Sequence, residues 1–133
     1  MTSISATSVV VDDDPIIPED CMVAARAADA KSGEDTVILA MGELLGITDA
    51  FVITSGHNPR QVKAIVDEVE RRVKESGGGP PVRVEGLSDA RWVLMDYGDF
   101  LVHVFLDEAR EFYDLEHLWS DALRIPWAAP SAT

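Results

Sequence analysis

Two residues that could do acid–base chemistry, Asp96 and His103, lie close together in the segment WVLMDYGDFLVHVF. If Gly98-Asp99 forms a two-residue turn, they take diagonal positions on one face of a β-hairpin. A carboxylate that orients a histidine is half of a catalytic arrangement, but the sequence places no serine or cysteine nucleophile beside it. The pair predicts a structural or partner-binding role, because buried polar groups commonly satisfy each other. An enzyme that uses both residues is the alternative.

Aromatic and acidic side chains are interleaved in the same segment, where Trp92, Met95 and Tyr97 surround Asp96 and Asp99. Tryptophan and tyrosine bury a large area at low rotamer cost and are enriched in interface hot spots. With the carboxylates, they indicate docking on a basic protein surface. The alternative is that Trp92 and Tyr97 pack in the core or on a face of the sheet.

A second candidate for partner binding is Arg60, in the first turn of a helix that begins at Pro59. A cation there opposes the helix dipole by about 0.3 to 1 kcal/mol, so stability does not explain it. Arg60 and Lys63 could meet a carboxylate or phosphate of a partner, although Lys63 could instead pair with Asp67. The loop 54–58 before them either holds an anion or is an ordinary capped connection.

The spacing of the histidines and cysteine predicts no metal site and no cofactor. His57, His103 and His117 fall on separate predicted elements, without HxxxH or CxxC spacing. No pair of alternating carboxylates follows Ser55-Gly56, as a two-metal phosphoryl-transfer site would require. The single cysteine, Cys21, cannot form an internal disulfide, which agrees with a reducing compartment.

The elements that must position these residues alternate between helices and strands. Pro18 and two carboxylates predict the start of a helix over 19–31, and apolar β-branched runs predict two central strands at 36–41 and 50–54. A helix over 59–75, a short strand over 82–85, the hairpin 91–106 and an amphipathic helical segment from Asp107 to Pro126 follow. This order predicts an α/β fold with a mixed β-sheet of about five strands flanked by helices.

Side-chain patterns within these elements make further predictions. In helix 59–75, Asn58 is the cap, Gln61 completes a capping box, and the apolar face is Val62, Ile65, Val66, Val69 and Val73. Hairpin pairs on one face are Tyr97 with Phe100, Met95 with Val102 and Val93 with Val104. Pairs on the other face are Asp96 with Leu101, Leu94 with His103 and Trp92 with Phe105. The C-terminal segment should bury Ala109, Phe112, Leu115, Trp119 and Leu123.

Length and charge limit the class of protein. The chain has 133 residues, 47% of them hydrophobic and 26% charged, which suits one globular domain. We expect a flexible acidic N-terminal extension over 1–17, the domain over 18–125 and a C-terminal tail over 126–133. With 24 acidic and 11 basic residues, the net charge of −13 disfavours direct binding to nucleic acid and favours a basic protein partner. No targeting signal or membrane span is predicted, so the expected location is cytoplasmic.

Several stretches together resemble the ribosomal silencing factor family, also called the RsfS or Iojap family. They are AARAADAKSGEDTVIL, GITDAFVITSG, NPRQVKAIVDEVE, the VEG at 84–86, WVLMDYGDFLVHVF and EAREFYDLEHLWSDA. These stretches occur in family order over about residues 20–122, and their combination is specific.

The resemblance implies a nucleotidyltransferase-like fold without that activity and a tendency to form homodimers. It also implies binding to the large ribosomal subunit through ribosomal protein uL14 (L-fourteen), a block on joining of the small subunit, and repression of translation when nutrients are short. The family's patterned residues fall here on Asp49, Ser55, Gly56, Arg60, Val62, Trp92, Asp96, Gly98, Asp99, His103, Arg110, Tyr113, Leu115 and Trp119. We expect docking chiefly through Trp92, Asp96, Tyr97 and Asp99. A role in assembly of the large subunit would use the same surface.

Overall fold

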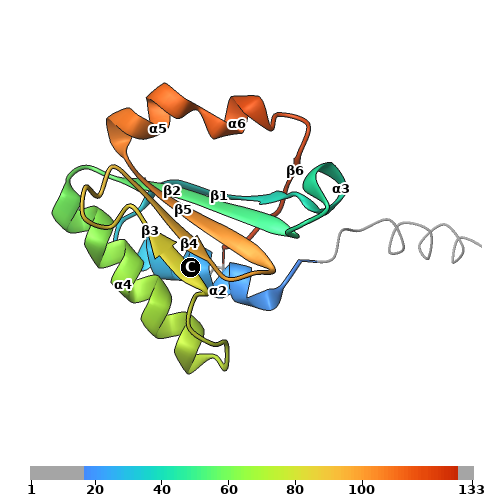
Figure 1. Ribbon diagram of the computed structural model, residues 1–133, viewed down its shortest axis with the longest axis horizontal. Coiled ribbons are helices and arrows are strands. Elements are labelled where there is room, and N and C mark those ends of the chain that lie inside the picture. The colour runs from blue at the N-terminus through green and yellow to red at the C-terminus, as the bar shows by residue number, and fades with distance from the viewer. Residues whose placement is uncertain (1–16, 129–133) are drawn as a thin grey trace, which may run out of the picture.

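A computed structural model describes residues 17–128, whose strands form one mixed sheet (Figure 1). The strands are β1 (Glu34–Ala40), β2 (Ala50–Gly56), β3 (Arg83–Glu85), β4 (Trp92–Asp96), β5 (Phe100–Leu106) and β6 (Leu123–Arg124). The helices are α2 (Glu19–Ala30), α3 (Gly42–Leu45), α4 (Pro59–Glu75), α5 (Asp107–Tyr113) and α6 (Leu115–Leu118). The α/β class is confirmed. The predicted strand number was one too low, because β6 has only two residues.

The sheet has the strand order β3-β4-β5-β2-β1-β6, and β2 and β5 are its parallel pair. The helices α2 and α4 cover one face, and α5 and α6 cover the other (Figure 1). Each face has its own apolar cluster, with Val52 and Ile65 in the first and Phe51 and Phe105 in the second. β2 is central and buried along its whole length, as predicted. β1 instead lies second from the edge, between β2 and β6.

The helix α4 has the predicted boundaries. The Asn58 side chain accepts the backbone N–H of Gln61 at 2.8 Å, so the cap is confirmed. The Gln61 side chain accepts the N–H of His57 at 2.7 Å, one residue before the position that a capping box uses. All five predicted apolar positions of this helix are buried, and they fix it on the sheet.

The β4–β5 hairpin has the predicted register at each of its five paired positions. The Tyr97 N–H also donates to the carbonyl oxygen of Phe100 at 3.0 Å, which closes the turn. Gly98 has a φ of +86°, the positive value that a two-residue hairpin turn requires. Local turn geometry and side-chain alternation therefore sufficed to place every residue of this hairpin.

The C-terminal segment departs from the single amphipathic helix that was predicted. Asp114, with φ +47° and ψ +55°, ends α5 and precedes α6, so the segment forms two short helices. Ala109, Leu115 and Trp119 still pack in the cluster under these helices. Phe112 is 77% exposed and Leu123 is 58% exposed, so the prediction that both are buried is wrong. The helical period is broken at Asp114, before Leu123, whereas Phe112 lies within α5 and is exposed there.

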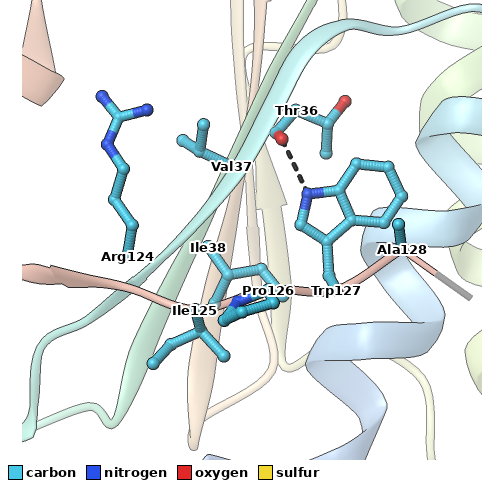
Figure 2. A pocket seen from close by; sticks show the side chains of 8 residues that line it. All are labelled: Thr36, Val37, Ile38, Arg124, Ile125, Pro126, Trp127 and Ala128. Atoms are coloured by element: carbon cyan, nitrogen blue, oxygen red, sulfur yellow. Dashed lines mark hydrogen bonds between the residues drawn. The ribbon is translucent and has the colours of Figure 1, made fainter. Parts of the chain in front are cut away.

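Residues 126–128, predicted as part of a tail, run beside β1 instead. Figure 2 shows the Trp127 indole turned toward β1, where its Nε1–H donates to the Thr36 carbonyl oxygen at 2.8 Å. The Arg26 side chain donates to the Trp127 carbonyl oxygen at 3.0 Å. With Val37 and Ile38, this segment lines an open groove. The part of the tail at 129–133 and the predicted extension at 1–16 lie outside the described residues.

Candidate functional site

The hairpin places the predicted docking residues on two faces of the sheet. Trp92 packs on the face covered by α5 and α6, whereas Tyr97 packs on the face covered by α2 and α4. Asp96 is an even number of residues from Trp92 and therefore shares its face. The predicted register already contained this separation, because alternate residues of a strand point to opposite faces.

Trp92 is held by three neighbours at the margin of the sheet. Its Nε1–H donates to Nδ1 of His103 at 3.1 Å. Its ring stacks on Phe105 with 4.9 Å between centroids, and the Tyr113 ring lies 4.7 Å away. Tyr113 is 47% exposed, and the neighbouring Phe112 is more exposed still. We call Trp92, Phe112 and Tyr113 the aromatic face. The predicted docking set lacked Phe112 and Tyr113, although the family pattern included Tyr113.

Met95 and His103 lie behind the surface. Met95 is fully buried in the core on the α2–α4 side, and His103 is 4% exposed. The prediction that these two side chains contact a partner is therefore wrong, because neither can reach one in this conformation. His103 instead supports the aromatic face through its hydrogen bond to the indole of Trp92.

Asp96 and His103 do not form the predicted bridging pair. The Asp96 carboxylate accepts the Gly98 N–H at 2.8 Å and lies 3.3 Å from the Arg83 guanidinium. His103 Nε2 is buried and has no hydrogen-bond partner among the described residues. The carboxylate that would orient this histidine for catalysis is thus engaged elsewhere, which removes the arrangement on which the enzyme hypothesis depended.

Burial lowers the pKa of His103 to about 4. We therefore expect its imidazole to stay neutral at pH 5 in the folded protein, and its ring resonances to titrate near pH 4 in NMR spectra. Because the unfolded state binds this proton more readily, His103 makes stability fall as the pH drops from about 6.5 to about 4. Titration of His103 at its ordinary value of 6.5 in folded protein would contradict this burial.

Tyr97 and Asp99 lie near the hairpin turn but in different surroundings. Tyr97 is half-buried and stacks on Phe100 at 4.8 Å. Burial, with smaller contributions from Glu70 and Asp20, raises the pKa of its hydroxyl to about 12. Asp99 is exposed, so its carboxylate is available to a basic partner. Tyr97 therefore packs on the α2–α4 side of the sheet, and its contact with a docking partner stays a prediction.

Arg60 lies at the exposed start of α4, away from Trp92. Among residues 17–128, no carboxylate comes within 4.0 Å of its guanidinium. Lys63 likewise does not form the alternative ion pair with Asp67 within that distance. Neither cation of this helix turn is therefore paired within residues 17–128, and contact of Arg60 with a partner stays a prediction.

His57 lies between two carboxylates, an arrangement that the sequence did not predict. Its Nδ1 is 2.6 Å from Oδ2 of Asp107, and its Nε2 is 3.0 Å from Oε2 of Glu34. These three side chains are close enough to share a cation. Because each ring nitrogen already faces its own carboxylate, the geometry is that of a protonated imidazole with two acceptors. The residues come from three separate elements, so no local spacing could reveal them.

In the described part of the chain, no helix has both the length and the apolar character that crossing a bilayer would require.

Known proteins are similar to this chain both in sequence and in fold. A family model described as "Ribosomal silencing factor during starvation" matches residues 15–132. Ribosomal silencing factor RsfS of Bacillus subtilis (strain 168) is 42% identical over 100 residues, covering 75% of this chain and 84% of that protein. A mouse protein named mitochondrial assembly of ribosomal large subunit protein 1 is 32% identical over 92 residues, covering 68% of this chain and 40% of that protein.

Solved structures show the same fold. A crystal structure of a Chromobacterium violaceum protein has a TM-score of 0.75 and 33% identity, covering 88% of this chain and 96% of that one. A second, from Bacillus halodurans, has a TM-score of 0.67 and 38% identity, covering 78% and 93%. The family match continues past residue 122, where the sequence resemblance had been expected to end.

Proposed function

This chain belongs to the ribosomal silencing factor family, and on that premise we propose that it represses translation by binding the large ribosomal subunit. Ribosomal protein uL14 is the docking partner, and the bound protein sterically blocks association with the small subunit when nutrients are limiting. The protein acts in the cytoplasm and has no catalytic step. It also forms a homodimer.

The aromatic face supports this proposal. Trp92 and Tyr113 come from different elements, and their rings lie 4.7 Å apart at the surface. Beside them, Phe112 exposes 77% of its area, which is unusual for a phenylalanine in a monomer. Exposed aromatic side chains held in one orientation are typical of interface hot spots, because they bury area without losing much rotamer freedom. The exposed rings of Phe112 and Tyr113 beside the half-buried Trp92 are the observation that carries the proposal.

Charge supports a basic protein as the partner. The chain carries a net charge of −13, and the side chain of Asp96, on the same sheet face as Trp92, is 20% exposed. Asp114, next to Tyr113, adds an exposed carboxylate beside this face, and Asp99 adds another at the hairpin turn. Opposite potentials steer a basic protein toward such a surface, whereas the phosphate backbone of RNA is repelled. Arg60 lies outside the aromatic face, so we propose it as a secondary contact.

A mechanism by exclusion requires only occupancy of the surface between the subunits. Asp96 is engaged by Arg83 and Gly98, and His103 by Trp92, so both have structural tasks on this face. The Bacillus subtilis relative is named as a silencing factor and not as an enzyme. Both observations favour a role without chemistry.

Co-sedimentation with isolated large subunits tests the proposal, with small subunits as the control. We expect Tyr113→Ala to weaken binding at least about 30-fold, a loss of about 2 kcal/mol, because an exposed hot-spot ring is removed without opening the core. In the same gradients, wild-type protein should reduce the amount of joined ribosomes, and Tyr113→Ala should leave more of them joined. The matched control is Lys74→Ala, an exposed substitution in α4 on the opposite layer.

Two results would contradict this assignment. If wild-type protein at micromolar concentration does not sediment with large subunits, the proposed function is wrong. If it does sediment, and Tyr113→Ala binds as tightly as Lys74→Ala, docking uses another surface and the aromatic face must be abandoned. Circular dichroism of each variant establishes that it is folded.

Assistance in assembly of the large subunit is a second candidate. The name of the 32% identical mouse relative favours it. The two functions differ in the particle that is bound: a silencing factor prevents joining of mature subunits, whereas an assembly factor acts on immature large particles. Gradient profiles of cells that lack the protein separate them, since only the assembly role predicts accumulation of precursor particles.

A further inference from the structure

His57 joins three elements at the carboxyl ends of the parallel strands. It follows β2, Glu34 begins β1, and Asp107 begins α5. The ring nitrogens lie 2.6 Å from the Asp107 carboxylate and 3.0 Å from the Glu34 carboxylate. β2 and β5 end side by side, with Gly56 opposite Leu106, so the residues that follow them are brought together. The bridge therefore connects the start of α5 to two neighbouring strands.

Both contacts can be hydrogen bonds only when the imidazole is protonated. A neutral imidazole has one N–H, so one of the two carboxylates would then face a ring lone pair. The hydrogen bond to Asp107, followed by the charges of Glu34 and Asp107, raises the pKa of His57 above its ordinary value of 6.5. Burial is the only influence that lowers it, and the His57 side chain is 60% exposed.

The other charged groups on β1, α4 and α5 do not oppose the raised pKa of His57. β1 contributes Asp35 and α5 contributes Glu108, two carboxylates that are each adjacent in sequence to a bridge residue. The cation of α5, Arg110, is directed to the backbone oxygens of Glu34 and Asp35 and to the carboxylate of Glu116. On α4, Arg60 is exposed and makes no ion pair among the described residues. The bridge thus lies in a predominantly acidic environment.

The helix that this bridge holds carries two of the three residues of the aromatic face. Phe112 and Tyr113 are at the end of α5, one and a half turns from Asp107 by the helix period. α5 has only seven residues, and such a short helix depends on tertiary contacts for its order. Its first turn is attached to the sheet by Asp107, and its second by Arg110.

We propose that His57 is a positioning residue whose protonated side chain fastens α5 to the sheet, so that ordering of the aromatic face depends on pH. This rests on the proposed docking function only for its consequence at the ribosome. The sign follows from the raised pKa: the folded state holds the proton more tightly than the unfolded state. The bridge is therefore complete below pH 6.5 and is lost as the pH rises through the shifted value.

Hydrogen exchange and NMR test the bridge without any ribosome. In wild-type protein, the His57 ring should titrate above 6.5, and α5 amides should open more as the pH rises, by at most about tenfold per pH unit for one linked proton. His57→Gln keeps a hydrogen-bonding side chain but has no charge. Its α5 amides should open more than those of wild type at low pH, and this difference should shrink steadily as the pH rises. Comparison at each pH cancels the intrinsic exchange rate.

The matched control is His117→Gln, in α6. His117 is 84% exposed and its ion-pair partner is Asp114 at 3.5 Å, so its substitution should leave the pH profile of α5 unchanged. A wild-type His57 that titrates at or below 6.5 overturns the proposal, even if His57→Gln fails to fold. A parallel pH profile of α5 in wild type and His57→Gln also overturns it.

Binding to isolated large subunits at about pH 6.5 and about pH 8.5 separates this proposal from the docking function. If both hold, wild-type affinity falls at the higher pH, whereas the affinity of His57→Gln stays at the lower level throughout. If wild type binds at neither pH but α5 keeps its His57-dependent profile, the docking function fails and the bridge stands. If the ratio of the affinities at the two pH values is the same for wild type and His57→Gln, the link between the bridge and docking is overturned.

Discussion

Arg110→Ala is expected to lower the free energy of unfolding by about 3 kcal/mol, because the buried Ser55, the half-buried Glu116 and two backbone carbonyl oxygens lose their donor together. The Arg110 side chain is 11% exposed. It donates to the carbonyl oxygens of Glu34 at 2.7 Å and Asp35 at 2.6 Å, to Oγ of Ser55 at 3.1 Å, and with two nitrogens to Glu116 at 3.1 Å. Urea unfolding followed by circular dichroism measures this loss, and binding to large subunits should fall with it as α5 detaches.

Arg124→Ala is the matched control, because Arg124 contacts the same Glu116. Its guanidinium is 62% exposed and lies 3.6 Å from the Glu116 carboxylate, so its loss should change stability by less than about 1 kcal/mol. Arg110→Lys keeps the charge but not the several N–H donors of the guanidinium. Its loss of stability should lie between those of Arg110→Ala and Arg124→Ala. Equal stability of the Arg110→Ala and Arg124→Ala variants would show that α5 and α6 are held by apolar packing alone.

Gly86→Ala is expected to destabilise the protein by about 3 kcal/mol or more, since two unfavourable effects combine at this position. Gly86 has a φ of +87°, where a Cβ is strained in any surroundings. The added Cβ would also collide with the backbone carbonyl oxygen of Trp92, which cannot move without shifting β4. Thermal unfolding should show the loss, and the intrinsic fluorescence of the tryptophans should report the displaced Trp92.

Gly98→Ala separates these two effects. Gly98 has nearly the same φ, +86°, but nothing lies within 4 Å of its added Cβ among the described residues. Only the conformational strain remains there, about 1 to 2 kcal/mol. If Gly86→Ala were no more destabilising than Gly98→Ala, the close approach of the chain to Trp92 would not be rigid.

Local interactions explain what was predictable in the fold. The boundaries of α4 follow from Asn58, Pro59 and the apolar period that ends at Val73, all within one segment. The register of the β4–β5 hairpin follows from a two-residue turn and side-chain alternation. In both cases neighbouring residues supply the partners, so the sequence contains the whole signal.

Predictions failed where distant segments compete with local pattern. The helical period after Asp107 predicted that Phe112 and Leu123 are buried, but Phe112 is exposed within α5, and the turn at Asp114 and the pairing of β6 with β1 redirect the chain that carries Leu123. Trp127, assigned to a tail, finds its partner at Thr36, 91 residues earlier. Neither event has a local signature, because Asp114 is neither glycine nor proline and β6 has only two residues.

The candidate site divides in the same way. The sequence by itself determined the acidic charge, the α/β class, the hairpin that carries Trp92, and the family to which the chain belongs. Only the tertiary structure decided that the Tyr113 ring lies beside Trp92 and that His57 lies between Glu34 and Asp107. The reason is physical: charge and periodicity are sums over neighbouring residues, whereas a surface or a bridge forms from side chains that meet only when the sheet and its helices pack.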